Sequence, residues 1–333
     1  MLKDRIAHYR QLEQLRGSKL LVYVTGDRKG LELNIAPDIL PFVGRHLEAM
    51  GDVPRISLLL HTRGGITLAA WSLVNLIRSY CQEMEVIVPF RALSAGTLIC
   101  LGAERIVMTR QAALGPIDPS TNGYMNPQVD INGKRVKVPL SVEQVSAYLD
   151  MARNDLGIHD QQHLKDILIQ LAEKVHPLSL GDVYRSRAQI QMLAKRLLRN
   201  QRIDPEKEAR AISFLTSESG SHDYTIHRQE AAEELGLHVE RPDDVQEALV
   251  RAIYRDISTE LELDEPYDPR FMLAQAAPVK YAHRRGLIES LAGGTHVFLS
   301  TGVLARPAAA TPQGPPFMDQ RTFEGWRHEP IVG

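Results

Sequence analysis

An α/β fold with a covered, mostly parallel sheet is predicted by three features of the sequence. Apolar runs of strand length occur at residues 20–24, 56–60, 84–88 and 106–108. Segments with helical spacing of apolar residues alternate with these runs, at residues 35–50, 66–80 and 95–103. Apart from Ser57 and Glu85, these runs are apolar at successive positions rather than at every second one, which indicates strands buried on both faces by helices. Such alternation of strands and helices is typical of an α/β architecture.

Most of the remaining segments are predicted to be helices. A short charged helix is expected over residues 3–16, and Asn132-Gly133 predicts a type I′ turn in a hairpin over residues 129–137. Ser141-Val-Glu-Gln is a capping box that opens a helix of about twelve residues. Further helices are expected at residues 160–175 and 183–200, within 205–240, and at 243–260.

These elements suggest a division of the chain into four parts. We expect an N-terminal helix at 1–18, a main domain at 19–260 and a C-terminal extension at 261–304. Residues 305–333 begin with a run rich in Ala, Pro and Gly, and this tail is expected to be disordered or loosely docked.

Composition excludes several classes of protein. Lys plus Arg number 39 against 41 Asp plus Glu, a net charge of -2, so nucleic acid is not an expected partner. The two cysteines, Cys81 and Cys100, lack the spacing of metal ligands and favour a reducing compartment. No secretory signal is visible, and the longest weakly polar run is shorter than the roughly 20 residues that span a bilayer. We therefore expect a cytoplasmic protein without an integral membrane segment.

Two turns at strand ends carry the chemistry that the sequence predicts. The first is His61-Thr-Arg-Gly64-Gly65, where paired glycines leave backbone N–H groups unshielded at the start of a helix. Such N–H groups bind developing negative charge, as an oxyanion hole requires. The second places Ser94 at the head of an apolar helix, where the N–H of Ala95 would be another oxyanion donor. A serine at this position is also a common helix cap. A catalytic role is therefore favoured only because both turns occur together and in this order.

The chain resembles the serine dehydrogenase proteinase family, soluble relatives of signal peptide peptidase A within the Clp protease/crotonase superfamily. The matching pieces cover roughly residues 18–260 and are His61-Thr-Arg-Gly-Gly, Val88-Pro-Phe-Arg-Ala-Leu-Ser-Ala-Gly-Thr, Leu114-Gly-Pro-Ile-Asp-Pro, His176-Pro-Leu-Ser-Leu-Gly and Ser221-His-Asp-Tyr-Thr-Ile-His-Arg-Gln-Glu-Ala. The resemblance implies a crotonase-like spiral of ββα units with additional C-terminal helices. It also implies a nucleophile at Ser94, an oxyanion site at Gly65 and Ala95, a peptide or protein substrate, and a homo-oligomer of trimers or their multiples.

The general base is less well defined by the sequence. Clp-type peptidases carry a His after the nucleophile helix, and the corresponding stretch here, residues 114–119, has none. Signal peptide peptidases use a Lys shortly after a Gly, and the similar stretch here is Gly133-Lys-Arg-Val-Lys137. Lys137 is the first choice and Lys134 the second; they are three residues apart, so on a strand they face opposite sides. His222, followed by Asp223, is the alternative base.

Three functions remain open at this point. The leading one is an ATP-independent serine peptidase that forms an acyl-enzyme on Ser94 with a Lys base. The second is an acyl-CoA enzyme on the same fold, and the third is a non-catalytic assembly or binding module. Neither a nucleotide-binding loop nor a dinucleotide fingerprint is visible, so no cofactor is expected. His159 and His163 lie one helical turn apart without a third ligand, and no metal is expected either.

Overall fold

The structure is a computed structural model of the whole chain. It describes all residues except 1, 118–119, 122–124, 132–133, 139, 219–220, 222, 276–277, 307–316 and 330–333.

The core of the molecule is an eight-stranded sheet in the order β12-β5-β3-β2-β1-β13-β14-β15. The five strands from β12 to β1 run parallel, and β13 to β15 continue the sheet in antiparallel fashion. The parallel part confirms the predicted α/β fold. Its strands are β1 (Lys19–Thr25), β2 (Val53–His61), β3 (Cys81–Val88), β5 (Arg105–Met108) and β12 (Val239–Glu240).

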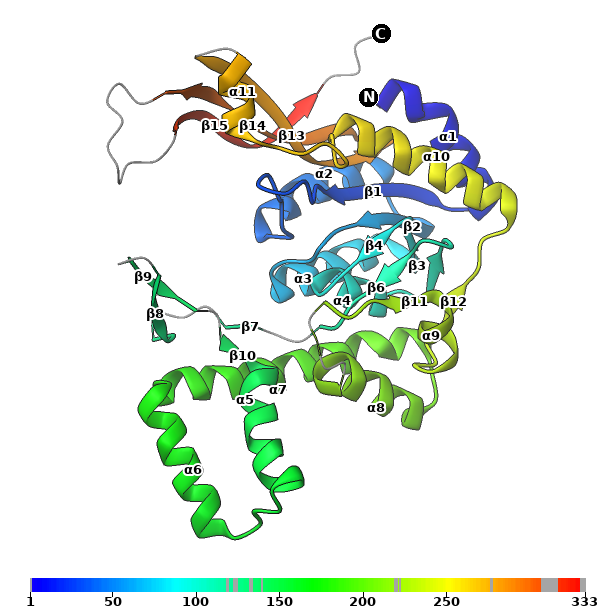
Figure 1. Cartoon of the computed structure of the whole chain (residues 1–333). Coiled ribbons are helices and arrows are strands. Elements are labelled where there is room, and N and C mark those ends of the chain that lie inside the picture. The colour runs from blue at the N-terminus through cyan, green and yellow to red at the C-terminus, as the bar shows by residue number, and fades with distance from the viewer. Residues whose placement is uncertain are drawn as a thin grey trace.

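Helices cover both faces of this parallel part (Figure 1). On one face, α2 (Leu40–Met50), α3 (Thr67–Arg78) and α4 (Ala95–Leu101) bury the larger apolar core. On the other face, α1 (Leu2–Arg16) and α10 (Asp244–Glu260) bury a second core that includes Leu59, Ile87 and Val107. Alternate residues of each strand therefore enter different cores, which explains why the strands lack a polar face in the sequence.

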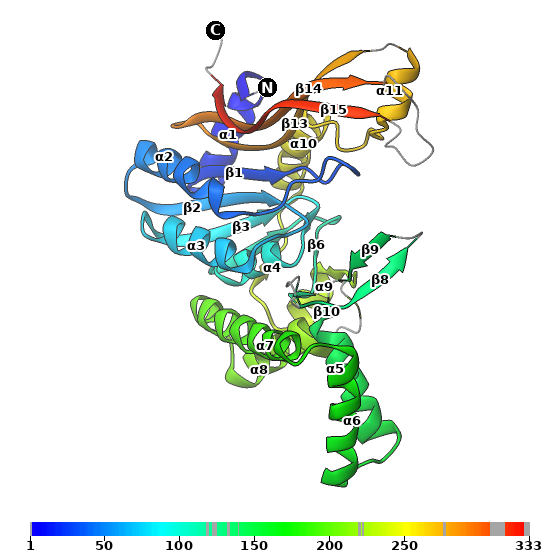
Figure 2. The same ribbon diagram turned by 90° about the vertical axis from the view of Figure 1, so that its left-hand side faces the viewer.

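Three small sheets accompany the large one. The three-stranded sheet β11-β6-β4 lies at the ends of the central strands. A two-stranded pair, β7 and β10, and the predicted hairpin, β8 and β9, stand apart from the central sheet (Figures 1 and 2). Their bounds are β4 (Arg91–Ala92), β6 (Ala113–Leu114), β11 (Ile226–His227), β7 (Ser120–Thr121), β10 (Leu140–Ser141), β8 (Gln128–Ile131) and β9 (Lys134–Lys137).

A helical arm projects away from the sheet (Figure 2). It consists of α5, the π-helical turn η2, α6 and the first part of α7, whose last part packs on α4. The chain then returns to the body through α8, η4 and α9. The bounds are α5 (Val142–Asp150), η2 (Met151–Asp155), α6 (Gln161–Lys174), α7 (Pro177–Leu198), α8 (Pro205–Ser213), η4 (Phe214–Glu218) and α9 (Arg228–Glu233), with short 3-10 turns η1 (Pro37–Ile39) and η3 (Arg199–Gln201).

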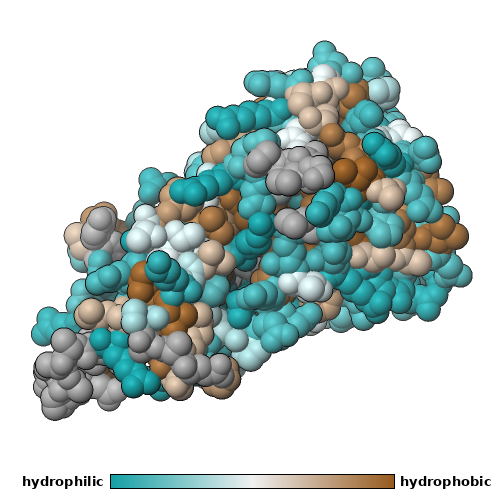
Figure 3. Space-filling view, turned by 90° about the horizontal axis from the view of Figure 1, so that it is seen from above, coloured by the Kyte–Doolittle hydropathy of each residue, from teal (hydrophilic) through white to brown (hydrophobic). Residues whose placement is uncertain are grey.

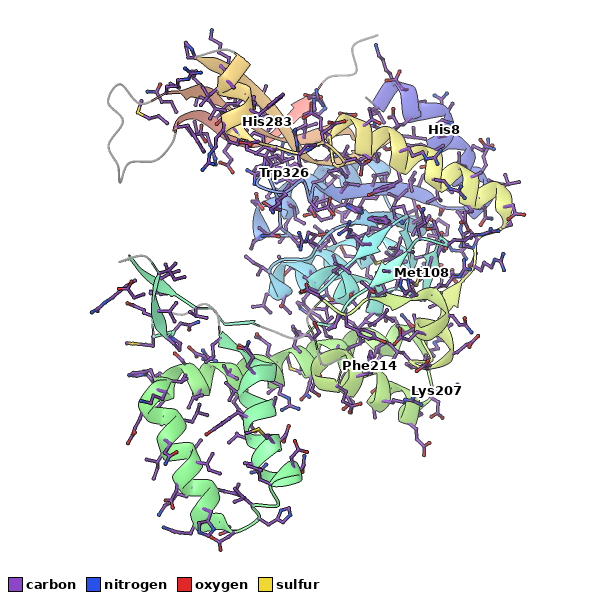
Figure 4. The ribbon with its side chains drawn as sticks, in the orientation of Figure 1. His8, Met108, Lys207, Phe214, His283 and Trp326 are labelled. Carbon is purple, nitrogen blue, oxygen red and sulfur yellow. The ribbon has the colours of Figure 1, made fainter. Side chains whose placement is uncertain are left out.

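The C-terminal part differs from the expectation of a loosely docked tail. After α11 (Pro269–Gln275), the chain forms β13 (Val279–Ser290), β14 (Gly294–Ala305) and β15 (Met318–Glu329). The expectation of disorder is wrong for β15, which pairs with β14 along its whole length. Trp326 of β15 packs against Tyr23, Phe42 and Phe298, so one large apolar side chain fastens this edge strand to the body (Figure 4). The Ala- and Pro-rich composition belongs to residues 305–316 and conceals the strand behind it.

The surface seen from above is mostly hydrophilic (Figure 3). Hydrophobic side chains form small groups on this face rather than one broad patch. Among the described helices, none is long and apolar enough to span a bilayer.

Candidate active site

The two turns predicted to carry the chemistry lie side by side. The segment that follows β2 and the segment that contains β4 meet at a parallel bridge between Thr62 and Ala92. The Thr62 N–H donates to the Arg91 carbonyl at 3.0 Å, and the Leu93 N–H donates to the Thr62 carbonyl at 3.1 Å. Because both segments leave the carboxyl ends of parallel strands, the site lies at the edge of the sheet where α/β proteins bind ligands.

Ser94 has a strained backbone at the head of α4. Its φ of 53° and ψ of -116°, with the Gly96 N–H donating to the Leu93 carbonyl at 2.8 Å, define a tight turn of type II′. For a residue with a Cβ, such a backbone conformation costs roughly 1–3 kcal/mol of free energy, and strain of this kind is common at active sites. The half-buried Ser94 side chain makes no capping hydrogen bond to the helix. The structure therefore does not support the alternative that Ser94 serves as a helix cap.

Gly64 brings the glycine turn into contact with Ser94. Its φ is 112°, and a Cβ at this position would lie 2.8 Å from the Cβ of Ser94 and 3.2 Å from the N of Ala95. Only glycine permits this approach, since any side chain would have to displace the Ser94 turn.

The backbone N–H groups near Ser94 differ in availability. Ile35 clamps the glycine turn, because its N–H donates to the Gly64 carbonyl and its carbonyl accepts the Ile66 N–H, each at 2.8 Å. Since these two bonds flank Gly65, the Gly65 N–H points away from Ile35. The Gly64 N–H donates to the Thr62 hydroxyl at 3.0 Å and is therefore occupied, unlike the expectation for this residue. Within the described chain, the N–H groups of Gly65 and Ala95 have no acceptor.

Thr97 attaches the loop at Leu114-Gly115 to α4, the helix that begins after Ser94. Its hydroxyl lies 2.8 Å from the carbonyl oxygens of both Ala92 and Gly115, and it accepts the Gly115 N–H at 3.0 Å. The Leu114-Gly115 loop thus lies against Leu93 and Thr97, on either side of Ser94 in the sequence. The sequence marks Thr97 only as part of the Ser-Ala-Gly-Thr motif, without a role.

The candidate bases lie away from this buried cluster or outside the described residues. Lys137 is exposed on β9, opposite Gln128. Lys134 lies at the start of the same strand, opposite Ile131, and its side chain is outside the described part. His222 is also outside the described residues. The structure thus brings Ser94, Gly64, Gly65 and Ala95 together and leaves the base to be identified.

A buried charged cluster next to the site was not predicted. The Asp27 carboxylate lies 3.4 Å from Nε2 of His61 and 3.2 Å from Nε of Arg91. Burial alone would raise the pKa of Asp27, but the hydrogen-bonding and charge interactions with His61 and the charge of Arg91 outweigh it, and the pKa is lowered. The sequence gives no sign of this cluster, because His61 and Arg91 lie 34 and 64 positions after Asp27 in the chain.

The structure also has a groove that lies apart from this site. A groove of about 920 Å³ lies at the amino ends of β3 and β5, where its lining includes Arg78, Arg105 and Arg202. None of the residues around Ser94 lines it. Among the described residues, no group of three or more His, Cys, Asp or Glu side chains is placed to hold a metal ion.

Replacing Gly65 by Ala tests the geometry of the glycine turn. The new Cβ would lie 2.3 Å from the Ile35 carbonyl oxygen at a φ of 149°. We expect the free energy of unfolding to fall by at least roughly 1–3 kcal/mol. Gly44→Ala is the matched control, because a Cβ there meets nothing within 4 Å in a helix, and stability should hold or rise by up to about 1 kcal/mol. Urea denaturation measures both; equal stability of the two variants would contradict the described turn.

Known proteins resemble the segment that contains this site. Residues 42–153 match the family described as ClpP-like SDH-type serine proteinases. Two uncharacterized proteins of Methanocaldococcus jannaschii are similar: MJ0137, 35% identical over 192 residues, and MJ1495, 28% identical over 133 residues. These matches cover 57% and 37% of this chain, and 56% and 44% of the relatives, so the chain spans about half the length of the curated relatives it matches.

Solved structures show weaker similarity. A serine-to-alanine mutant of the 1510-N membrane-bound stomatin-specific protease is 18% identical, with a TM-score of 0.37 over 70% of this chain and 85% of that chain. ClpP1 from Listeria monocytogenes is 14% identical, with a TM-score of 0.38 over 71% of this chain and 99% of that chain. Both similarities are distant, and the description of the site therefore depends on this chain's own geometry. Residues 42–153, which include Ser94 and both glycines, are thus similar to the ClpP-like SDH-type serine proteinases.

Proposed function

We propose that the protein is an ATP-independent serine peptidase with Ser94 as its nucleophile. The observation that carries this proposal is the strained, uncapped Ser94 beside two N–H groups without acceptors, those of Gly65 and Ala95. The family match over this segment supports the same reaction class.

The proposed reaction uses these groups in two stages. The Ser94 hydroxyl loses its proton to a base, and its oxygen attacks the carbonyl carbon of a peptide bond. The Gly65 and Ala95 N–H groups donate hydrogen bonds to the oxyanion that forms, and fixed donors of this kind are worth about 3–4 kcal/mol each. The amine leaves with a proton, which gives an ester on Ser94. Water then hydrolyses the ester and restores the serine.

Covalent labelling with a fluorophosphonate probe tests the nucleophile. We expect the protein to react stoichiometrically and Ser94→Ala to lose labelling, because the probe reacts with activated serines. Ser79→Ala is the control, since Ser79 is exposed at the end of α3 and its hydroxyl contacts only a helix carbonyl. Equal labelling of the Ser94 variant would exclude this nucleophile. Absence of labelling in all three proteins would favour the acyl-CoA or the non-catalytic alternative, which retention on a CoA column distinguishes.

For the base we propose Lys137 first, Lys134 second and His222 as the alternative. A lysine works as a base only as the neutral amine, which a covered and desolvated position favours. The β8–β9 hairpin exposes Val129, Ile131 and Val136, and an isolated two-stranded hairpin is marginal in water. We therefore expect substrate or another chain to cover the hairpin and Lys137 with it.

Single substitutions distinguish the candidate bases. Lys137→Ala should abolish probe labelling, whereas His222→Ala should leave the labelling rate unchanged. Arg135→Ala on the same exposed strand is the matched control for loss of a positive charge. If His222→Ala abolishes labelling and Lys137→Ala does not, the role passes to His222; if only Lys134→Ala does so, it passes to Lys134.

We also propose that copies of the chain assemble through the helical arm, into trimers or their multiples. In α6 no residue is buried, and Leu168 and Ile169 are 49% and 50% exposed. Helices gain most of their stability from packing of an apolar face, and in α6 Leu171 packs on a small apolar cluster while Leu168 and Ile169 stay exposed. The exposed Leu178 and Tyr184 at the start of α7 extend the same arm.

Charge placed on this arm should disrupt the assembly. We expect Leu168→Glu combined with Ile169→Glu to lower the particle mass in multi-angle light scattering to that of one chain, about 37.3 kDa. Gln161→Glu, an exposed polar position at the start of α6, is the control and should leave the mass unchanged. A wild-type particle that already has the mass of a single chain would contradict the proposal.

A further inference from the structure

The carboxylate of Asp27 contacts side chains from both segments that form the candidate active site. His61, at 3.4 Å, is the last residue of β2 and stands four residues before Gly65. Arg91, at 3.2 Å, begins β4 and stands three residues before Ser94. Both contacts use the same oxygen, Oδ2 of Asp27. One carboxylate thus connects the strand that leads to the glycine turn with the strand that leads to the nucleophile.

Two of the three titratable side chains are buried, those of Asp27 and His61, whereas the Arg91 side chain is 34% exposed. The His61 side chain is fully buried and that of Asp27 is 9% exposed. Phe90 stacks on His61, Tyr254 of α10 packs against both rings, and the Arg91 guanidinium lies 4.6 Å from the Phe90 ring centroid. Neither His61 nitrogen nor Oδ2 of Asp27 has a well-aligned hydrogen bond in the described chain. Attraction between the Asp27 carboxylate and the Arg91 guanidinium, together with the packing of Phe90 and Tyr254 on His61, therefore holds these groups together.

A second connection joins the end of β1 to the glycine turn through hydroxyl groups. The hydroxyl of Thr25, the last residue of β1, donates to the Thr62 hydroxyl at 2.7 Å, which in turn accepts the Gly64 N–H at 3.0 Å. Thr25 and Asp27 flank Gly26, whose N–H donates to the Arg285 carbonyl at 2.7 Å and whose carbonyl accepts the Leu33 N–H at 2.8 Å. The end of β1 is therefore fixed from two sides and offers a rigid anchor for both connections.

We propose that Asp27, together with His61 and Arg91, is a positioning group that sets the separation between the Gly65 N–H and the Ser94 turn. The backbone bridge at Thr62 joins the two segments one residue after His61 and Arg91, and Asp27 holds these two side chains at the base of that bridge. This inference depends on the proposed peptidase function. Misplacement of a reacting group by about 1 Å is enough to cost on the order of a hundredfold in rate.

The charge of Asp27 is what the positioning requires. The pKa of Asp27 is lowered despite burial, so the carboxylate is ionised at neutral pH and faces the Arg91 cation. Asparagine has nearly the same shape but no charge, and in its place the Arg91 guanidinium would lose its counter-charge. Removal of one member of a buried charged group weakens the group as a whole.

Asp27→Asn tests the proposal by separating the rate of chemistry from probe binding. We expect its maximal inactivation rate with the fluorophosphonate probe to fall about tenfold or more, while the half-saturating probe concentration changes less than about twofold. Combining Asp27→Asn with His61→Gln should lower the rate little further, because the residues act as one unit. Glu85→Gln is the matched control, since Glu85 is a buried carboxylate paired with Arg16 near the amino end of β3. It should lose comparable stability and keep the wild-type inactivation rate.

Amide hydrogen exchange supplies a readout that does not need activity. In Asp27→Asn, residues 62–66 and 92–96 should exchange faster, while Glu85→Gln should leave both segments unchanged. An unchanged inactivation rate and unchanged exchange in Asp27→Asn would overturn the proposal, as would equal effects of the two variants. If the wild-type protein is not labelled, the proposed function fails, and the exchange comparison alone then decides whether Asp27 positions the two turns.

Discussion

The candidate site depends on the backbone bridge between Thr62 and Ala92. Two hydrogen bonds at this bridge bring the end of β2 and the segment before α4 into register. With that register fixed, Gly64 comes against Ser94, and the Gly65 and Ala95 N–H groups remain without acceptors in the described chain. A second bridge, between Ile35 and Gly65, fixes the direction of the Gly65 N–H, because the two hydrogen bonds of Ile35 go to the residues on either side of Gly65.

The strained backbone conformation of Ser94 is held in place by the residues packed around it. The buried α4, the Thr97 contacts with Ala92 and Gly115, and the close approach of Gly64 leave the turn little room to relax. A serine with a positive φ is retained only where its surroundings determine the conformation more strongly than its own preference. The parallel sheet provides these surroundings, because strands buried on both faces cannot move independently of the helices that cover them.

The chain combines this rigid body with two parts that depend on other contacts. The β13–β15 extension is fastened to the body by Trp326 and by the pairing of β13 with β1. The arm formed by α5, α6 and the start of α7 instead exposes apolar side chains, and so does the β8–β9 hairpin that carries Lys137. The part of the site that the single chain completes by itself is thus the nucleophile and the oxyanion donors. The base is proposed to come from a segment whose surroundings lie partly outside the chain.

The sequence alone determined the parallel core and the nucleophile turn, because both follow from local patterns. Continuous apolar runs and helical spacing predicted β1, β2, β3 and β5 with the helices between them, and Gly64-Gly65 and Ser94 follow strands directly. Only the tertiary structure decided which backbone N–H groups of the glycine turn can bind an oxyanion, since the Gly64 N–H already donates to the Thr62 hydroxyl. It alone showed the Asp27 cluster, whose members come from three strand ends, and the strand β15 beyond the Pro-rich segment. Contacts between residues far apart in the chain leave no periodicity or spacing in the sequence, and for that reason no local pattern could reveal them.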